Sequence, residues 1–151
     1  MKISNEDRKL LLADLCARLP YKPMIWVFPQ TRKRKPLSSG YIHHIAIGIA
    51  DYKPYLRSLS DMSEDESVDF YTNVFKVDID KLKESFDGNI LAPFYLKDGK
   101  WYFELLFENP YVSDFSNITD WLNAHHFDYR GLIEKKLAIK APKDMYNFEK
   151  E

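Results

Sequence analysis

Cysteine is almost absent from this chain of 151 residues, because Cys16 is the only one. A single cysteine cannot form an intramolecular disulfide bond, and without a CxxC pair it cannot contribute to a zinc knuckle. No apolar run reaches the roughly 18 residues that a membrane-spanning helix needs. Residues 1–8 mix both charges and precede an amphipathic run, unlike a secretory signal peptide. We therefore expect a cytoplasmic protein without disulfide bonds.

Glycine is also scarce, and the sequence contains none of the common catalytic motifs. The chain has five glycines and none belongs to a repeat, which argues against a collagen-like or low-complexity protein. It contains no GxSxG, Walker, HExxH or GxGxxG motif. No pair of carboxylates is singled out by its spacing. The sequence thus predicts no cofactor and no bound metal, and it favours a non-enzymatic protein.

The chain does contain enough apolar material for a core. Hydrophobic residues make up 45% of it and aromatic residues 15%. A chain of this size removes about two-thirds of its unfolded surface from water on folding. We predict a single globular domain over residues 1–151, with a loosely held tail from about residue 142.

Charge is distributed unevenly, although the net charge is −1. Residues 1–60 hold 11 Lys+Arg and 4 Asp+Glu, which gives +7, and residues 61–151 hold 11 and 19, which gives −8. Such asymmetry indicates either a basic face for an acidic partner or two halves whose fields cancel after folding.

The N-terminal part predicts a helix followed by two strands. Ser4 is a suitable N-cap, and leucines at helical spacing predict the buried face: Leu12, Leu15 and Leu19, with Leu11 widening the stripe. On another face, Asp14 and Arg18 could pair at i,i+4. Residues 24–28 predict a strand, residues 30–40 a loop, and residues 41–50 the clearest strand.

The C-terminal part mixes helices with a hairpin. A capping box at Ser63 begins one helix, residues 78–86 predict another, and Ser116 or Asn117 begins a third. Asp98-Gly99 between apolar runs predicts a hairpin. Residues 128–136 predict a short helix capped by Asp128, and residues 137–139 a last strand. The fold class is α+β, with a small, mostly antiparallel sheet covered by two or three helices.

Two pairs of adjacent histidines could bind a metal ion or take part in catalysis, namely His43-His44 and His125-His126. Neighbours in a strand or a helix point apart, so both members of one pair cannot bind one metal ion. A site would need one histidine from each pair and a carboxylate such as Asp51 or Asp128. Core or surface histidines are the favoured interpretation.

Cys16 could act as a nucleophile if a histidine met it in space. It lies inside the first predicted helix, away from the N-terminal amides that would lower the pKa of its thiol. We therefore expect Cys16 to be a small, buried core residue.

A basic loop suggests binding of nucleic acid. Its four consecutive cations could neutralise phosphates: Arg32, Lys33, Arg34 and Lys35. The aromatic residues Trp26, Phe28 and Tyr41 lie near it in sequence and could stack on bases. Against this hypothesis, a run of charges is common on solvated loops, and the isoelectric point near 6.4 is unlike that of a dedicated nucleic-acid binder.

An aromatic segment over residues 120–133 suggests binding of protein. Within it, Tyr129 and Arg130 are of the residue types that dominate protein-binding surfaces. The alternative is structural: Trp121, Phe127 and Leu132 form part of the core, while Asp128 caps a helix and pairs with Arg130.

Three stretches of the chain carry a resemblance. They are residues 5–21, residues 53–57 with Met62-Ser63 after them, and residues 121–133 extended to residues 137–138. These stretches resemble a group of uncharacterised small proteins of gut Bacteroidales bacteria and their phages. The resemblance implies an intracellular protein of a bacterium or phage, in a mobile-element setting. The group usually continues after its Leu-Pro-Tyr with glycine and a polar strand, whereas Lys22-Pro23 and an apolar strand follow here.

Three functional hypotheses result. The leading one is a non-enzymatic accessory protein that binds another macromolecule, most plausibly a protein, at Tyr129 and Arg130. The second is nucleic-acid binding through Arg32 to Lys35, and the third is a histidine- or cysteine-dependent enzyme.

Overall fold

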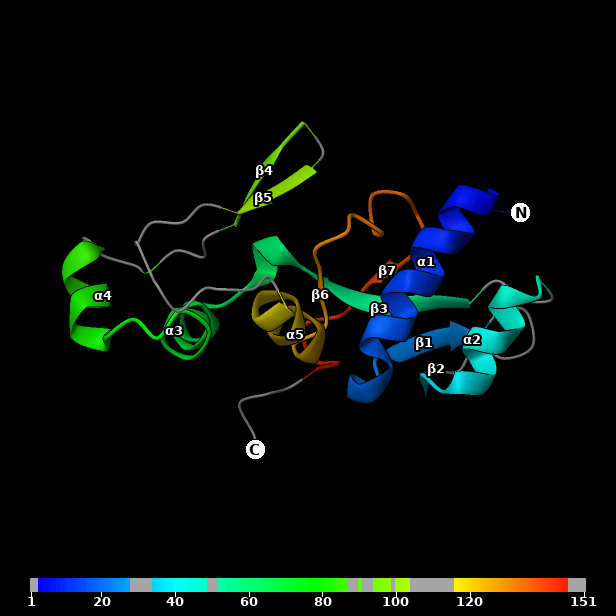
Figure 1. Ribbon diagram of the computed structural model, residues 1–151, viewed down its shortest axis with the longest axis horizontal. Helices are drawn as coiled ribbons and strands as arrows, with labels where there is room; N and C mark the ends of the chain where they lie inside the picture. Colours follow the sequence, from blue (N-terminus) through cyan, green and yellow to red (C-terminus); the bar gives the residue numbers. More distant parts are fainter. Residues whose placement is uncertain are drawn as a thin grey trace. The chain divides into compact units, whose positions relative to one another are not determined.

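A computed structural model of the chain describes residues 3–27, 34–48, 52–86, 90, 94–98, 100–103 and 116–146 (Figure 1). Contacts between residues divide the chain into two compact units. Unit 1 comprises residues 1–58 and 123–151, and unit 2 comprises residues 59–122. The prediction of one globular domain stays a prediction. Within the described ranges, no helix is long and apolar enough to cross a membrane.

Unit 1 contains a mixed sheet. Strand β1 (Met24–Val27) pairs antiparallel with β2 (Arg34–Pro36) and with β3 (Tyr52–Ser58). Two short strands pair parallel with β3, namely β6 (Phe127–Asp128) and β7 (Ile139–Lys140). The predicted α+β class is confirmed. The predicted strand over residues 24–28 is confirmed as far as Val27, and the last strand forms two residues later than predicted.

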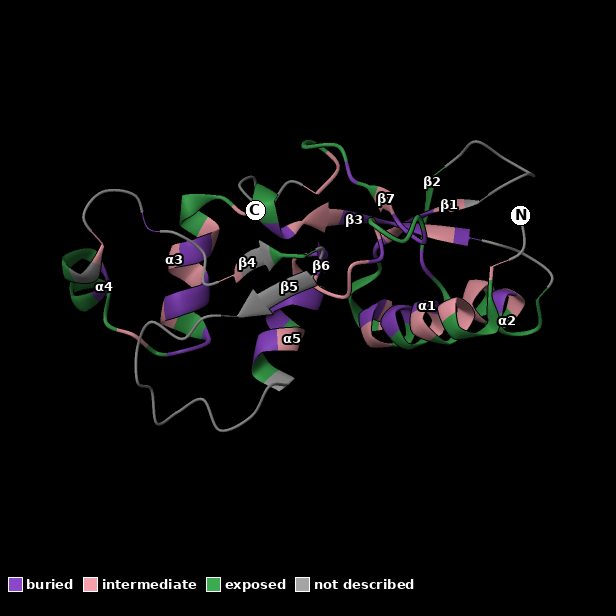
Figure 2. Cartoon of the chain, turned by 90° about the horizontal axis from the view of Figure 1, so that it is seen from above, coloured by how far each residue is buried: buried purple, intermediate pink, exposed green. Residues whose placement is uncertain are grey.

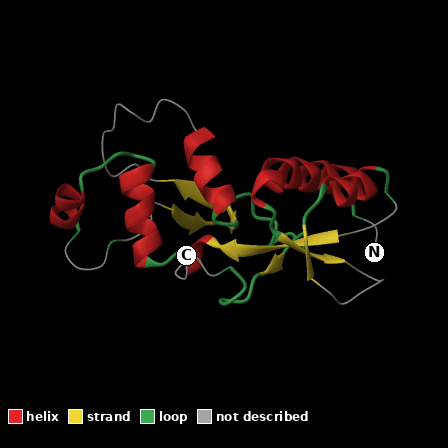
Figure 3. Ribbon diagram, turned by 90° about the horizontal axis from the view of Figure 1, so that it is seen from below, coloured by secondary structure: helices red, strands yellow, loops and turns green. Residues whose placement is uncertain are grey.

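Helices α1 (Asn5–Arg18) and α2 (Ser39–Ala46) lie together on one face of this sheet (Figure 3). A 3-10 turn, η1 (Leu19–Tyr21), follows α1 at Pro20. Side chains from both helices and from β1 and β3 fill the space between the layers. The core cluster consists of Leu11, Leu15, Ile25, Leu37, Ile45, Tyr52, Leu56, Leu132, Leu137 and Ala138.

Helix α1 begins as predicted, and its buried face shares Leu11 and Leu15 with the predicted stripe. The Ser4 hydroxyl accepts a hydrogen bond from the Asp7 amide at 3.1 Å, which is the expected N-cap bond. The buried residues of α1 are Leu11, Asp14, Leu15 and Arg18. Leu12 and Leu19 of the predicted stripe are only partly buried. The Asp14–Arg18 pair therefore lies on the core face, which corrects the prediction that it occupies another face.

The predicted strand over residues 41–50 is wrong, because residues 39–46 form α2. Ser38, in extended conformation, stands at the N-cap, and Gly48 follows the helix with φ of +76°. Ile45 is 1% exposed, and Tyr41 and Ile42 pack partly buried against the core. The alternation of isoleucines at residues 45, 47 and 49 is typical of a strand. The helix instead directs Ile45 into the core, with Tyr41 and Ile42 beside it. The predicted loop over residues 30–40 is corrected as well, since it contains β2 and the start of α2.

The Tyr146 side chain joins β1 to β3. Ile25 pairs with Pro54, so Met24 and Tyr55 are the next residues opposite each other. The Tyr146 hydroxyl accepts a hydrogen bond from the Met24 amide at 2.7 Å and donates one to the Tyr55 carbonyl at 2.8 Å. Burial raises the pKa of this phenol to about 12. The hydroxyl thus satisfies two backbone groups at the point where the two strands separate.

Replacing Tyr146 by Phe should lower the free energy of unfolding by about 2 kcal/mol. The ring remains, but the Met24 amide and the Tyr55 carbonyl lose their shared partner, and a backbone group left unsatisfied costs about 1–3 kcal/mol. Urea unfolding followed by circular dichroism measures the change. The exposed Tyr21 provides the control, because Tyr21→Phe should change the free energy by less than about 0.5 kcal/mol. Equal, small effects of both variants would contradict the bridging role.

Unit 2 is mainly helical. It contains the 3-10 turn η2 (Leu59–Asp61), α3 (Glu64–Asn73), α4 (Ile79–Ser85), the hairpin of β4 (Phe94–Lys97) and β5 (Lys100–Phe103), and most of α5 (Ser116–Ala124). Three predictions are confirmed here: the capping box at Ser63, the helix after Asp78 and the antiparallel hairpin. At the turn of the hairpin, Asp98 takes φ of +51°.

Aromatic rings build the core of unit 2. Phe70 of α3 is fully buried, and its ring contacts the rings of Phe75, Phe94 and Trp121 with centroids 5.0–5.3 Å apart. The buried stripes of α3 and α5 are visible in Figure 2. Tyr71 and Phe75 are buried beside Phe70.

Candidate functional site

Tyr129 and Arg130 follow β6 in unit 1, in a turn that Asp128 organises. The two Asp128 carboxylate oxygens accept hydrogen bonds from the Leu132 amide at 3.0 Å and the Ile133 amide at 2.9 Å. Gly131 takes φ of +75°, a conformation that glycine adopts without strain. The predicted helix over residues 128–136 is wrong, because these residues form β6 and turns. Asp128 does cap backbone amides, but those of a turn.

A buried ion pair lies beneath this turn. Asp14 and Arg18 are both fully buried, and their side chains meet at 2.8 Å between Oδ2 and Nε. The Nη2 group of Arg18 donates a hydrogen bond to the Phe127 carbonyl at 2.6 Å. Since Phe127 belongs to β6, Arg18 ties α1 to the strand that leads into Tyr129.

Arg130 shares the same carboxylate. Its Nε lies 3.2 Å from Asp14 Oδ1, and 31% of its side chain is exposed. Arg130 therefore pairs with Asp14, which corrects the expected pairing with Asp128. The Tyr129 ring lies beside both guanidinium groups, with its centroid 5.3 Å from the Arg18 Cζ and 5.2 Å from the Arg130 Cζ. We call Asp14, Arg18, Tyr129 and Arg130 the arginine cluster.

Two carboxylates act within and beside the arginine cluster. The Asp14 carboxylate contacts two guanidinium groups, and the nearby Asp128 carboxylate also acts on Asp14. Burial raises the pKa of the Asp14 carboxyl, and the neighbouring Arg18 guanidinium opposes this rise. The Nη1 group of Arg18 is buried and has no hydrogen-bond partner among the described residues. Asp14 Oδ1 and Arg130 Nε also have no hydrogen-bond partner among these residues, because their 3.2 Å contact is an ion pair without hydrogen-bond geometry.

His126 lies close to the cluster and stacks on Tyr146, with ring centroids 4.0 Å apart. Burial, followed by the charges of Arg18 and Arg57, lowers the pKa of His126 to about 4. The ring is therefore neutral at physiological pH. Arg57 lies over the Phe127 ring at 4.2 Å and donates a hydrogen bond to the His125 carbonyl at 3.2 Å.

The histidines of the first pair, His43 and His44, lie on α2 rather than on the predicted strand. His43 is exposed, and His44 Nδ1 lies 3.2 Å from the Tyr52 hydroxyl. Among the described residues, no three His, Cys, Asp or Glu side chains are grouped so that they could hold a metal ion. Asp51, one of the suggested carboxylate ligands, lies outside those residues. Cys16 is exposed on α1, which corrects its expected place in the core.

The basic loop is only partly described. Arg32, Lys33 and the nearby Phe28 lie outside the described residues. Arg34 and Lys35 are exposed on β2, which is the terminal strand of the sheet path, and the Arg34 guanidinium lies 5.3 Å from the Tyr55 ring centroid. Trp26 and Tyr41 are partly buried, and Tyr41 packs edge-on against Tyr52.

Sequence reasoning found the exposed part of the cluster and missed its support. Trp121, Phe127 and Leu132 are buried as the structural alternative predicted. Asp14 and Arg18 were recognised as a pair but not as core residues. The signal was present, because residues 11, 14, 15 and 18 follow the i, i+3, i+4, i+7 spacing of one helix face.

Searches against protein-family models, curated proteins and solved structures found no match to the chain.

Proposed function

We propose that the chain is a non-enzymatic accessory protein that binds a protein partner through Tyr129 and Arg130. The observation that carries this proposal is the support of these two half-exposed side chains by the buried Asp14–Arg18 pair. Tyrosine and arginine are enriched among the residues that dominate binding energy.

Preorganisation favours this surface for binding. Asp14 restrains the Arg130 guanidinium, and the Asp128 bonds to the Leu132 and Ile133 amides fix the turn. Each rotamer-rich side chain that becomes ordered on binding costs about 0.5–1.5 kcal/mol. A surface whose Arg130 is already held avoids part of that cost, so more of the contact energy contributes to affinity.

The charge of the cluster indicates the chemistry of the partner. The Arg130 side chain is 31% exposed, so the carboxylate of an approaching Asp or Glu side chain can pair with its guanidinium group. Arginine binds carboxylates through two parallel hydrogen bonds, and Tyr129 adds an apolar face beside it. The proposed partner therefore presents an acidic residue next to an apolar one.

Affinity purification from a native-type host lysate tests the proposal, with nuclease treatment and quantitative mass spectrometry. The bait variants are Tyr129→Ala and Arg130→Ala, and the matched control is Tyr21→Ala on η1. We expect a stoichiometric protein that survives nuclease and the control substitution, and at least about tenfold less of it with either bait variant. Equal recovery with all baits would contradict the proposal.

Nucleic-acid binding is the second candidate, because Arg34 and Lys35 are exposed and the Arg34 guanidinium lies beside the Tyr55 ring. Basic side chains that neutralise phosphates give affinity that falls steeply with salt. In the same experiment, partners that disappear with nuclease, and with replacement of Arg32 to Lys35, would support this candidate and overturn the protein-binding proposal.

A further inference from the structure

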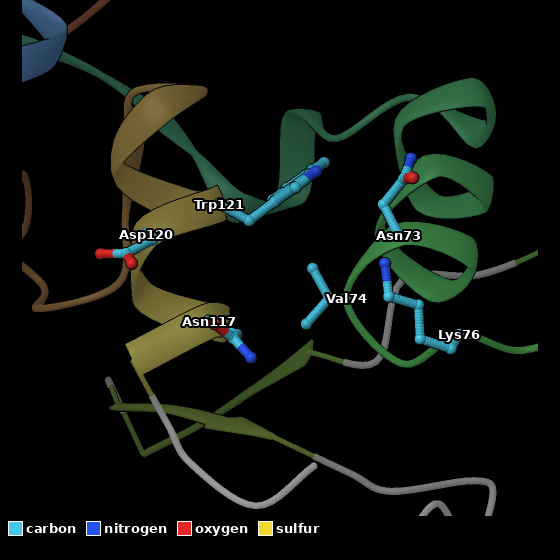
Figure 4. A pocket seen from close by; sticks show the side chains of 6 residues that line it. All are labelled: Asn73, Val74, Lys76, Asn117, Asp120 and Trp121. Carbon is cyan, nitrogen blue, oxygen red and sulfur yellow. The ribbon is translucent and has the colours of Figure 1, made fainter. Parts of the chain in front are cut away.

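A cavity of about 580 Å³ lies within unit 2, between the C-terminal end of α3 and the helix α5 (Figure 4). Its lining residues are Asn73, Val74, Lys76, Asn117, Asp120 and Trp121. Sites for small organic ligands usually occupy about 300–1,000 Å³ and combine an apolar surface with a few polar groups. This cavity has both properties, and none of the residues of the arginine cluster lines it.

Asp69 of α3 holds two walls of the cavity in place. One of its carboxylate oxygens accepts a hydrogen bond from the Trp121 indole nitrogen at 2.8 Å, and the other accepts one from the side-chain Nδ2 of Asn73. The Trp121 ring also packs edge-on against the buried Phe70, with centroids 5.0 Å apart. The walls are therefore formed before any ligand arrives, which lowers the entropic cost of binding.

The polar groups of the cavity favour an anion. In Figure 4 the Lys76 ammonium group and the Asn117 amide group lie on opposite sides of Val74, while the Asp120 carboxylate points away from Val74. Within the part of the chain that the structure describes, no ion pair engages Lys76. Asp69 and Asp78 are occupied by hydrogen bonds from donors other than Lys76. Lys76 is thus free to pair with a carboxylate.

The backbone at Lys76 explains how its side chain reaches the cavity. Lys76 has φ of +56°, in the left-handed region that usually accommodates glycine or asparagine after a helix. A lysine costs about 1 kcal/mol more than glycine in this conformation. The conformation reverses the chain after α3 and directs the side chain toward α5.

We propose that this cavity binds a small organic acid. Its carboxylate pairs with Lys76 and accepts a hydrogen bond from Asn117, and its flat apolar body lies against Val74 and Trp121. A neutral analogue of the same shape keeps the apolar contact and loses the ion pair, so it binds more weakly. This inference is independent of the arginine cluster and of the protein partner proposed for it.

Titration of the full-length, isotope-labelled protein with benzoate, followed by proton–nitrogen NMR, tests the proposal. Benzamide serves as the neutral probe. We expect saturable shifts at the Val74 amide and the Trp121 indole, and at least about fivefold weaker binding of benzamide, since charge-assisted hydrogen bonds are roughly twice as strong as neutral ones.

Two variants and a control complete the test. Lys76→Asn, which tolerates the left-handed conformation, should weaken benzoate binding about tenfold and leave benzamide binding unchanged. Asn117→Ala should weaken benzoate binding by a smaller factor. Lys83→Gln removes the same charge from α4 without altering the cavity lining, and should have no effect. Equal benzoate affinity in Lys76→Asn and wild type, or shifts that do not map to the cavity, would overturn the proposal.

Discussion

Asp14→Leu should lower the free energy of unfolding by about 3–5 kcal/mol, which is the largest single effect that we expect in this chain. The substitution leaves Arg18 fully buried without the carboxylate that its Nε contacts at 2.8 Å. Arg130 also loses its partner, but its side chain is 31% exposed and water can solvate it. The cost therefore comes mainly from the buried charge of Arg18. Urea unfolding at neutral pH measures it.

The double variant Asp14→Leu with Arg18→Met separates this charge effect from lost packing. Apolar residues of similar volume often replace a buried ion pair with little loss of stability. The double variant does leave the Phe127 carbonyl without the Arg18 donor, at a cost of about 1–3 kcal/mol. We therefore expect it to be more stable than Asp14→Leu alone, in spite of carrying two substitutions.

An exposed ion pair of the same unit provides the control for these variants. Lys135 lies 4.0 Å from Asp7, and both side chains are substantially exposed. Lys135→Gln should change the free energy of unfolding by less than about 1 kcal/mol, because water screens such pairs. If Asp14→Leu were as mild as this control, the Asp14–Arg18 pair could not be the support of the Tyr129–Arg130 surface.

Local sequence signals predicted several elements that are decided by local hydrogen bonds. The Ser4 cap, the Ser63 capping box and the antiparallel hairpin around Asp98 each depend on residues within a few positions of one another. The helix α2 shows the limit of such signals. The isoleucines at residues 45, 47 and 49 alternate as they would in a strand, but residues 39–46 form a helix that buries Ile45 in the core of unit 1. Tertiary packing commonly overrides intrinsic preference in short segments.

The candidate site depends on contacts that no local pattern contains. Arg18 donates its hydrogen bond to Phe127, 109 positions later in the chain. Tyr146 bridges Met24 and Tyr55 across separations of 122 and 91 positions. The spacing of Asp14 and Arg18 with Leu11 and Leu15 could have shown that the pair shares the core face. It could not have shown that Arg130 shares the Asp14 carboxylate.

His126 should make stability fall as the pH is lowered from about 6.5 to about 4. Its folded-state pKa is lowered to about 4, mainly by burial, whereas an unperturbed histidine titrates near 6.5. Between these values the unfolded chain binds more protons than the folded one, so unfolding becomes more favourable with acidity. The shift corresponds to a loss of about 3 kcal/mol by pH 4, which unfolding experiments across this range measure.

His126→Asn isolates this contribution. Asparagine cannot titrate here and tolerates the left-handed conformation that His126 adopts, with φ of +63°. The variant loses the stacking on Tyr146 and should be less stable than wild type near pH 7. The difference in free energy of unfolding between the variant and wild type should shrink or reverse toward pH 4. Only the wild type has an imidazole at this buried position, and its protonation favours the unfolded chain. The exposed His43 is the control, since His43→Asn should keep the pH dependence of wild type. A constant difference between His126→Asn and wild type from pH 7 to pH 4 would show that the neutral state of His126 contributes nothing to acid sensitivity.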